Sequence, residues 1–338
     1  MGAQTMGNSG GGGQVGQEIA ETEKGRLPAD RHGLGASAVL GAVLRGARSD
    51  LGQVGLTTLG ARTTRRVRAL GLGPDLPALL GLPIFRAHLR ALGVQDPLFF
   101  LAQRHYLTRD LALAERARAA SSHYLTEQVT QPSAYLSTVY QGEGLPLWAA
   151  AIGGHHYEIR LTGALDVANE GALSVSLMAD QTRVGIMSFS FVPSALVTAD
   201  SAAPGEAVFV VRKQLTRERS YQKPFFDAFD RSTPAHLLLA SVEGLVQARG
   251  GDRIHGVRAA CHPAITGENR SAMTAAYDDF WLSVGGTVAS ARAFCIPVPM
   301  QLRSVDELPP DRRHRALARR GHAAAIRAAA CQAMLALR

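Results

Sequence analysis

The chain of 338 residues has few cysteines, few aromatic residues and no long hydrophobic run. Its three cysteines, Cys261, Cys295 and Cys331, show no CxxC spacing, which argues against a zinc site and a disulfide framework. No apolar run approaches the roughly 18 residues that suggest a membrane span. The start of the sequence also lacks the charged and apolar regions of a secretory signal. We therefore expect a cytoplasmic protein without a metal.

Positive charge is in excess, with a formal net charge of +8 at pH 7. Such an excess favours anionic partners such as nucleic acid, anionic lipid or a phosphorylated cofactor. Much of it lies in a few arginine runs. The densest run, residues 312–320, holds Arg312, Arg313, Arg315, Arg319 and Arg320.

Composition divides the chain into four parts. Residues 1–31 are rich in glycine and polar residues, and they have too little apolar surface to offset ordering, which predicts a disordered tail. Residues 32–150 carry leucine and valine at helical spacing, interrupted by prolines, and predict a helical region. Residues 151–304 predict an α+β sheet domain. Residues 305–338 predict a basic C-terminal helix that starts at two consecutive prolines.

Within the third part, the apolar pattern first takes a period of two. Tyr157–Thr162, Ala172–Met178 and Val184–Val192 predict an antiparallel meander. Val184–Val192 is apolar on both faces, as a central strand is. Ala207–Lys213 predicts a fourth strand, and Leu215–Asp230 a polar connection.

The following stretch, residues 231–299, reads as helix, strand, helix and strand. Ser232 and Thr233 stand before Pro234, as capping residues stand before a first-turn proline. The expected elements are a helix from Pro234 to the glycines at 250 and 251, a strand Arg253–Cys261, a helix Ser271–Val284 and a strand Ala293–Val298. The sequence thus predicts an α+β fold: a helical N-terminal region, then an antiparallel-to-mixed sheet with packed helices. Meander and later strands should share one sheet.

Several segments carry a family resemblance. They are HYLTRDLALAERARAASSHY, YEIRLTGALDVANEGALSVSLMADQTRVGIMSFSFV, the TPAHLLL helix, CHPAITGENR and YDDFWLSVGG. Their order and spacing resemble the bacterial VirK/YbjX family over roughly residues 105–325. The resemblance implies a largely uncharacterised family that is associated with virulence and envelope stress in Gram-negative bacteria. A glycine-containing stretch usual in that family after the fourth strand is replaced here by RKQLTRERSYQKP.

The order of strands and helices also resembles the Gcn5-related N-acyltransferase fold. This resemblance implies acyl-CoA as cofactor and an amine of a peptide, polyamine or lipid as acceptor. In that fold, the loop after the fourth strand and the next helix N-terminus cradle the pyrophosphate. Here that segment has no glycine, so side chains would have to serve instead, and a solvated connection is the alternative. The candidates are Arg217, Arg219, Lys223, Arg231, Ser232 and Thr233.

Acyl transfer needs a base for the amine proton and an acid for the leaving thiolate. Tyr277 lies on the helix where the acyltransferase fold commonly holds its acid, His262 follows a strand, and Asp278 could orient the tyrosine. Each candidate has a structural alternative. Tyr277 and Trp281 could be a core aromatic pair, His262 a core histidine, and Asp278 a solvated helix residue.

A non-enzymatic alternative is an envelope-stress or virulence factor that binds an anionic membrane surface or a partner protein, and it rests on the basic helix. Residues 312–320, followed by an alanine-rich stretch, can lie on an anionic membrane surface, which would make the protein peripheral to the inner membrane. Nucleic acid is less favoured, because no aromatic interleaving or helix-turn-helix pattern accompanies the arginines. The helix could also pack on its alanine side with its arginines in water. Oligomeric state, and the choice between enzyme and binding protein, stay open.

Overall fold

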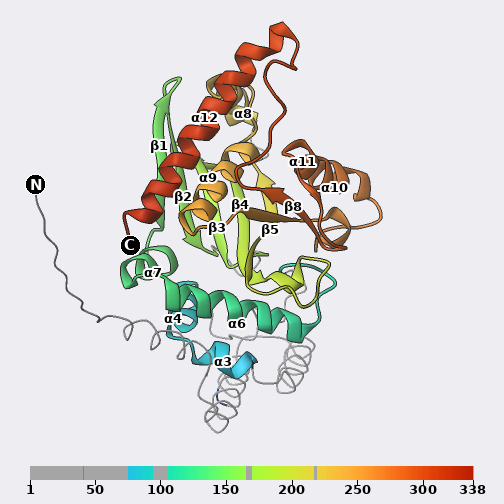
Figure 1. Ribbon diagram of the computed structural model, residues 1–338. Coiled ribbons are helices and arrows are strands. Elements are labelled where there is room, and N and C mark those ends of the chain that lie inside the picture. The colour runs from blue at the N-terminus through green and yellow to red at the C-terminus, as the bar shows by residue number, and fades with distance from the viewer. Residues whose placement is uncertain (1–40, 42–74, 94–105, 165–169, 217–218, 338) are drawn as a thin grey trace, which may run out of the picture.

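The computed structural model describes residues 41, 75–93, 106–164, 170–216 and 219–337 (Figure 1). The prediction for residues 1–31, and that for residues 32–74 of the helical region except residue 41, lie outside these residues. The longer helices are α3 (Asp75–Gly81), α4 (Pro83–Ala91), α6 (Leu113–Thr130), α7 (Ser133–Tyr140), α8 (Arg219–Ala228), α9 (Pro234–Ala248), α10 (Arg270–Ala276), α11 (Asp278–Ser283) and α12 (Pro310–Leu335).

Eight strands form one sheet in the order β1-β2-β3-β4-β5-β6-β8-β7. They are β1 (Leu145–Ile152), β2 (His155–Gly163), β3 (Leu173–Ala179), β4 (Thr182–Pro193), β5 (Glu206–Leu215), β6 (Arg253–Val257), β7 (Thr287–Val288) and β8 (Ala293–Pro297). β5 and β6 run parallel, whereas the other neighbouring pairs are antiparallel. The predicted α+β fold is confirmed, and so is the prediction that meander and later strands share one sheet.

The sheet's core face is covered by α9, and α9 is covered in turn by α12 (Figure 1). Of the 15 residues of α9, 13 are buried, because the helix is apolar around most of its circumference. β4 is equally buried along both faces, as its continuous apolar sequence predicts. α12 packs through Ala316, Ile326, Ala330 and Met334, so its alanine-rich side faces the protein.

A buried polar network joins the N-terminal helices to the sheet. The backbone N–H of Phe191 in β4 donates to His123 Nδ1 in α6 (3.1 Å). His123 Nε2 therefore carries the proton and donates to the Tyr140 hydroxyl (3.0 Å), which donates to Glu127 Oε2 (2.9 Å). Arg249, just after α9, also donates to Glu127. The network thus ties α6 and α7 to β4 and to the end of α9.

Four local predictions differ from the structure. Residues 145–152 lie mostly in the region predicted to be helical, yet they form β1. The connection Leu215–Asp230 contains α8, and Phe225 of α8 and Phe229, directly after the helix, are both buried. The predicted strand Arg253–Cys261 ends at Val257 and continues as a 3-10 turn. The helix predicted over Ser271–Val284 is interrupted at Tyr277, with φ −113° and ψ −64°, into α10 and α11.

Candidate functional site

The candidate site begins where β5 and β6 separate. The two strands pair over only three residues, with Val208 opposite Ile254 and Val210 opposite Gly256. On its other side, β5 pairs Val210 with Phe189 and Arg212 with Ser188, so Val211 is an extra residue in a β-bulge. A bulge bends its strand and increases its twist. Beyond the bulge, β5 continues to Leu215 beside β4, and no described strand pairs with its other edge.

Tyr277 and Trp281 fill the space between the separating strands. The Tyr277 hydroxyl accepts the backbone N–H of Lys213 on β5 (3.1 Å) and lies 3.4 Å from that residue's carbonyl oxygen. Trp281 donates its indole N–H to Val257 O on β6 (2.9 Å) and packs on Gly256, where no side chain would fit. Burial raises the pKa of Tyr277, so its hydroxyl keeps its proton at neutral pH.

His262 lies beside Tyr277, with ring centroids 4.4 Å apart, so these two predicted residues are brought together. His262 Nδ1 accepts the backbone N–H of Ala264 (3.1 Å), which places the ring proton on Nε2. Asp278 serves the neighbouring turn: its Oδ1 accepts the backbone N–H of Ala259 (2.7 Å), directly after β6. Its carboxylate thus holds the 3-10 turn that leads to His262.

Lys213 is a residue of this site that the sequence did not single out. Its Nζ lies 3.8 Å from the centroid of the Phe280 ring and 5.8 Å from that of Tyr277. Burial lowers the pKa of Lys213 to about 8. His236, at the start of α9, packs against Phe280, and its pKa falls to about 4 through burial and the nearby Lys213 and Arg319 charges. No local sequence pattern predicts a functional role for a lysine on a strand. The aromatic ring that Lys213 contacts comes from α11.

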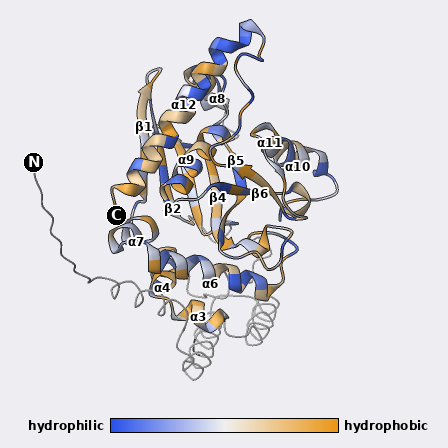
Figure 2. Cartoon of the chain, in the orientation of Figure 1, coloured by the Kyte–Doolittle hydropathy of each residue, from blue (hydrophilic) through white to orange (hydrophobic). Residues whose placement is uncertain are grey.

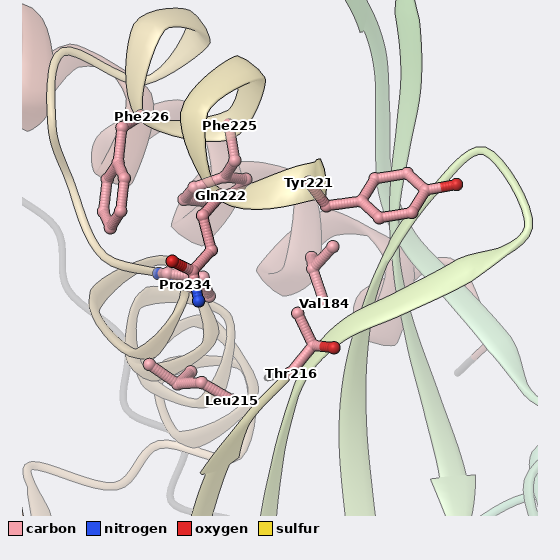
Figure 3. Close-up of a pocket in the computed structure, with 8 residues that line it drawn as sticks. All are labelled: Val184, Leu215, Thr216, Tyr221, Gln222, Phe225, Phe226 and Pro234. Atoms are coloured by element: carbon pink, nitrogen blue, oxygen red, sulfur yellow. The ribbon is translucent and has the colours of Figure 1, made fainter. Parts of the chain in front are cut away.

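A cavity of about 130 Å³ lies past the end of β5, between α8 and the start of α9 (Figure 3). Leu215, Phe225, Phe226 and Pro234 make its wall largely apolar, and Gln222 reaches into it from α8. An open groove adjoins this cavity, since Gln222 and Phe226 border both. The groove therefore joins an apolar cavity to a charged surface.

Two of the six predicted cofactor-binding residues, Lys223 and Arg231, line this groove and are exposed. Arg231 has a left-handed φ of 62°, which is uncommon for a residue other than glycine and brings the chain into α9. Ser232 is buried, and the Thr233 hydroxyl lies 2.7 Å from His236 Nδ1 instead of capping the helix backbone. Arg217 and the side chain of Arg219 lie outside the described part of the chain.

The predicted residues thus form two groups around the last residues of β5. Tyr277 and His262 lie near Lys213, whereas Lys223 and Arg231 lie by the cavity that Leu215 borders. Within the described residues, no group of three His, Cys, Asp or Glu side chains could hold a metal ion. Among the same residues, no helix is both long and apolar enough to span a membrane.

Comparison with known families places most of the described chain in a family. Residues 86–200 and 231–323, more than half of the chain, match the family described as protein of unknown function (DUF535). The chain belongs to this family. DUF535 contains the VirK/YbjX proteins, so the resemblance found in the sequence is confirmed. The match leaves out residues 201–230 of this DUF535 chain. They hold β5, α8 and RKQLTRERSYQKP, the stretch that replaces the family's usual glycine-containing segment. No curated protein and no solved structure matches the chain.

Proposed function

We propose that this DUF535 protein is an acyl-CoA-dependent N-acyltransferase whose active site lies where β5 and β6 separate. The observation that carries the proposal is the bulge at Val211, which coincides with the end of β5–β6 pairing. It leaves an edge of β5 facing Tyr277 rather than another strand. A strand edge of this kind offers backbone groups to an extended ligand. The order of the elements, which resembles the Gcn5-related N-acyltransferase fold, supports the same reading.

The residues beside the start of α9 suit the phosphates of coenzyme A. Lys223 and Arg231 provide two exposed cations, and the N-terminus of a 15-residue helix carries a partial positive charge. The apolar cavity of Figure 3 adjoins them and can take a non-polar part of the ligand. The Lys213 N–H is held by Tyr277, so a ligand that pairs there must displace the hydroxyl.

Acyl-CoA would supply a thioester carbonyl; the amine nitrogen bonds to its carbon, and the carbon–sulfur bond breaks. In this proposal Tyr277 donates a hydrogen bond to the leaving sulfur, and its protonated hydroxyl supports that role. Lys213, with a pKa of about 8, is a candidate base for the amine proton in its neutral form. His262 is the second candidate, and to act as a base its Nδ1 must first release the Ala264 N–H. Asp278 positions the turn before His262 rather than acting on a substrate.

The acceptor we propose is an amine of a peptide, polyamine or lipid, and the proposed location is the cytoplasm. The family's association with virulence and envelope stress favours an acceptor that belongs to the cell envelope. The second candidate is a non-enzymatic role in virulence or envelope stress, and the exposed arginines of α12 support it.

Calorimetry with coenzyme A on the full chain tests the proposal. The double variant Lys223→Ala/Arg231→Ala should bind at least tenfold more weakly, since each change removes a charge-assisted contact worth roughly 1.5–3 kcal/mol. Arg217→Ala/Arg219→Ala, predicted from the sequence, should show a similar loss. Arg86→Ala/Arg90→Ala, on the exposed side of α4, is the control and should bind normally.

Turnover separates catalysis from binding. Tyr277→Phe should keep coenzyme A affinity and slow thiol release by on the order of 10² to 10⁴. A binding protein shows no thioester affinity in the first place. Lack of coenzyme A affinity in the intact protein would exclude the enzyme and leave the second candidate.

A further inference from the structure

The start of α12 and the loop before it form a strongly basic end of the molecule, which we name the basic tip. It consists of residues 302–320, and its six arginines are Arg303, Arg312, Arg313, Arg315, Arg319 and Arg320. Three acidic residues, Asp306, Glu307 and Asp311, accompany them, so arginines outnumber acids two to one. In Figure 1 this end of α12 extends past the sheet, and Figure 2 shows it as hydrophilic.

The tip projects because α12 packs only from its second turn onward. Residues 310–315 are all exposed, and Ala316 is the first buried residue of the helix. Arg313 donates to the backbone oxygens of Leu308 and Asp306 (3.0 and 2.9 Å), and Arg320 donates to that of Arg303. These hydrogen bonds hold the loop against the helix, so the loop and the start of α12 form one continuous surface.

Two leucines stand exposed among the arginines. Leu317 is 57% exposed and Leu302 is 46% exposed. Helices that lie in a membrane interface combine basic residues with apolar side chains that enter the headgroup region. Lysine and arginine near an anionic leaflet each add attraction, which salt weakens. Nucleic acid would bind the arginines through its phosphates but would offer the exposed leucines no apolar partner. Residues 302–320 also contain no Phe, Tyr or Trp for base stacking.

We propose that the basic tip docks this protein on an anionic lipid bilayer. Just after the tip, α12 contacts the segment between α8 and α9, where His322 lies 3.5 Å from Asp230 and its ring packs on Phe229 (5.2 Å between ring centroids). Docking therefore places the end of α12 that contacts this segment nearer the bilayer. The proposal stands without acyl transfer, since it uses none of the residues assigned to catalysis or cofactor binding.

Vesicle sedimentation with the full chain is the test, using phosphatidylcholine vesicles with and without phosphatidylglycerol. The protein should sediment with the anionic vesicles and be released by salt. Arg312→Gln/Arg315→Gln should lower the partition coefficient on the order of 30-fold, and Leu317→Gln about tenfold. Both leave the backbone bonds of Arg313 and Arg320 in place. Arg86→Gln/Arg90→Gln is the matched control and should sediment like the wild type.

Three outcomes overturn docking. They are no sedimentation with anionic vesicles, equal binding to neutral vesicles, and an equal loss in the control variant. The first outcome, together with RNA binding that depends on Arg312 and Arg315, assigns the tip to nucleic acid. Coenzyme A calorimetry on Arg312→Gln/Arg315→Gln should match the wild type, so a failure of docking is distinguishable from a failure of the proposed enzyme.

Discussion

At the scale of single residues, Lys213 is the most informative position. Its ammonium lies over the Phe280 ring with its charge partly removed from water, and burial lowers its pKa from 10.5 to about 8. A cation held over an aromatic face recovers only part of the lost hydration. Burying this lysine therefore lowers the stability of the fold, and a perturbed pKa of this kind is typical of a functional site.

Replacing Lys213 with methionine tests this cost. Because the folded pKa lies below the unfolded one, the unfolded chain binds more protons between pH 8 and 10.5, and the wild-type free energy of unfolding gains from this group as pH rises through that window. Lys213→Met should lack this gain, on the order of 2 kcal/mol, and be no less stable at pH 7. Urea denaturation at both ends of the window measures it. Lys223→Met, at an exposed lysine, should keep the wild-type slope; equal slopes for both variants contradict the interpretation.

The residue types at the site were partly predictable. Tyr277 and His262 were chosen for their chemistry and their place after a strand and on a helix, and the structure brings their rings together. The contact of Asp278 with the Ala259 backbone could not be predicted, because the two residues lie 19 positions apart in sequence. Lys213 was missed for a related reason: its surroundings are made by α11, and no local pattern of β5 shows that.

At the scale of elements, the contact between α9 and α12 holds the C-terminal helix in place. Gly244 of α9 lies against the backbone of α12, where a Cβ would overlap Arg327 O and come within 2.9 Å of the Ala330 Cβ. Next to it, the buried carboxylate of Glu243 accepts from the Arg327 guanidinium (3.2 Å) and from the Met300 N–H (2.9 Å). The close approach thus allows an ion pair whose carboxylate is shielded from water.

Gly244→Ala should destabilise the protein by about 2 kcal/mol, because the added methyl forces two packed helices apart. Gly321→Ala in α12 is the matched control, since nothing lies within 4 Å of its Cβ position. The control should be neutral or stabilising by up to about 1 kcal/mol, as alanine favours a helix over glycine. Thermal unfolding of the two variants gives the comparison. Equal stability would show that α12 can shift on α9 without cost.

Elements were predictable where their burial was uniform. β4 and α9 are buried along most of their length and mostly apolar in sequence, which indicated a central strand for β4 and a helix for α9. β1 was missed because LPLWAAAI is alanine-rich and its strand form depends on pairing with β2. The break at Tyr277 was missed because no glycine or proline marks it; the hydroxyl's bonds to Lys213 lie at the same position.

At the scale of the whole molecule, two buried histidines lock the N-terminal helices to the sheet. His88 of α4 donates from Nε2 to Ala164 O beyond β2 (3.3 Å), since a carbonyl can only accept, and its Nδ1 accepts the Tyr124 hydroxyl (2.9 Å). His123 is fixed in the same tautomer by Phe191 and Tyr140. Both networks therefore require neutral imidazoles. A second proton would have to replace an accepted hydrogen bond by a buried charge.

This requirement predicts the pH range in which the fold weakens. Burial lowers the pKa of His88 to about 4 and holds that of His123 well below its usual value. Unfolded histidine titrates near pH 6.5. Below that pH the unfolded chain therefore binds protons at these histidines that the folded chain does not bind. The contribution of these histidines to the free energy of unfolding should thus be constant above pH 6.5. It should fall towards pH 4, by on the order of 3 kcal/mol for His88.

Urea midpoints measured from pH 7.5 to pH 4 check this expectation. His88→Gln can still donate to Ala164 O but cannot titrate, so it should be less stable than the wild type at pH 7.5 and lose less stability on acidification. His314→Gln, at an exposed position of α12, should follow the wild-type curve. A wild-type midpoint that stays flat down to pH 4, or an equal acid loss in His88→Gln, contradicts the neutral lock. Because the lock joins α4, α6 and β4, its protonation should release the N-terminal helices before the sheet. Tryptophan fluorescence, which comes from Trp148 in β1 and Trp281 beside β6, should then change at lower pH than helical circular dichroism does.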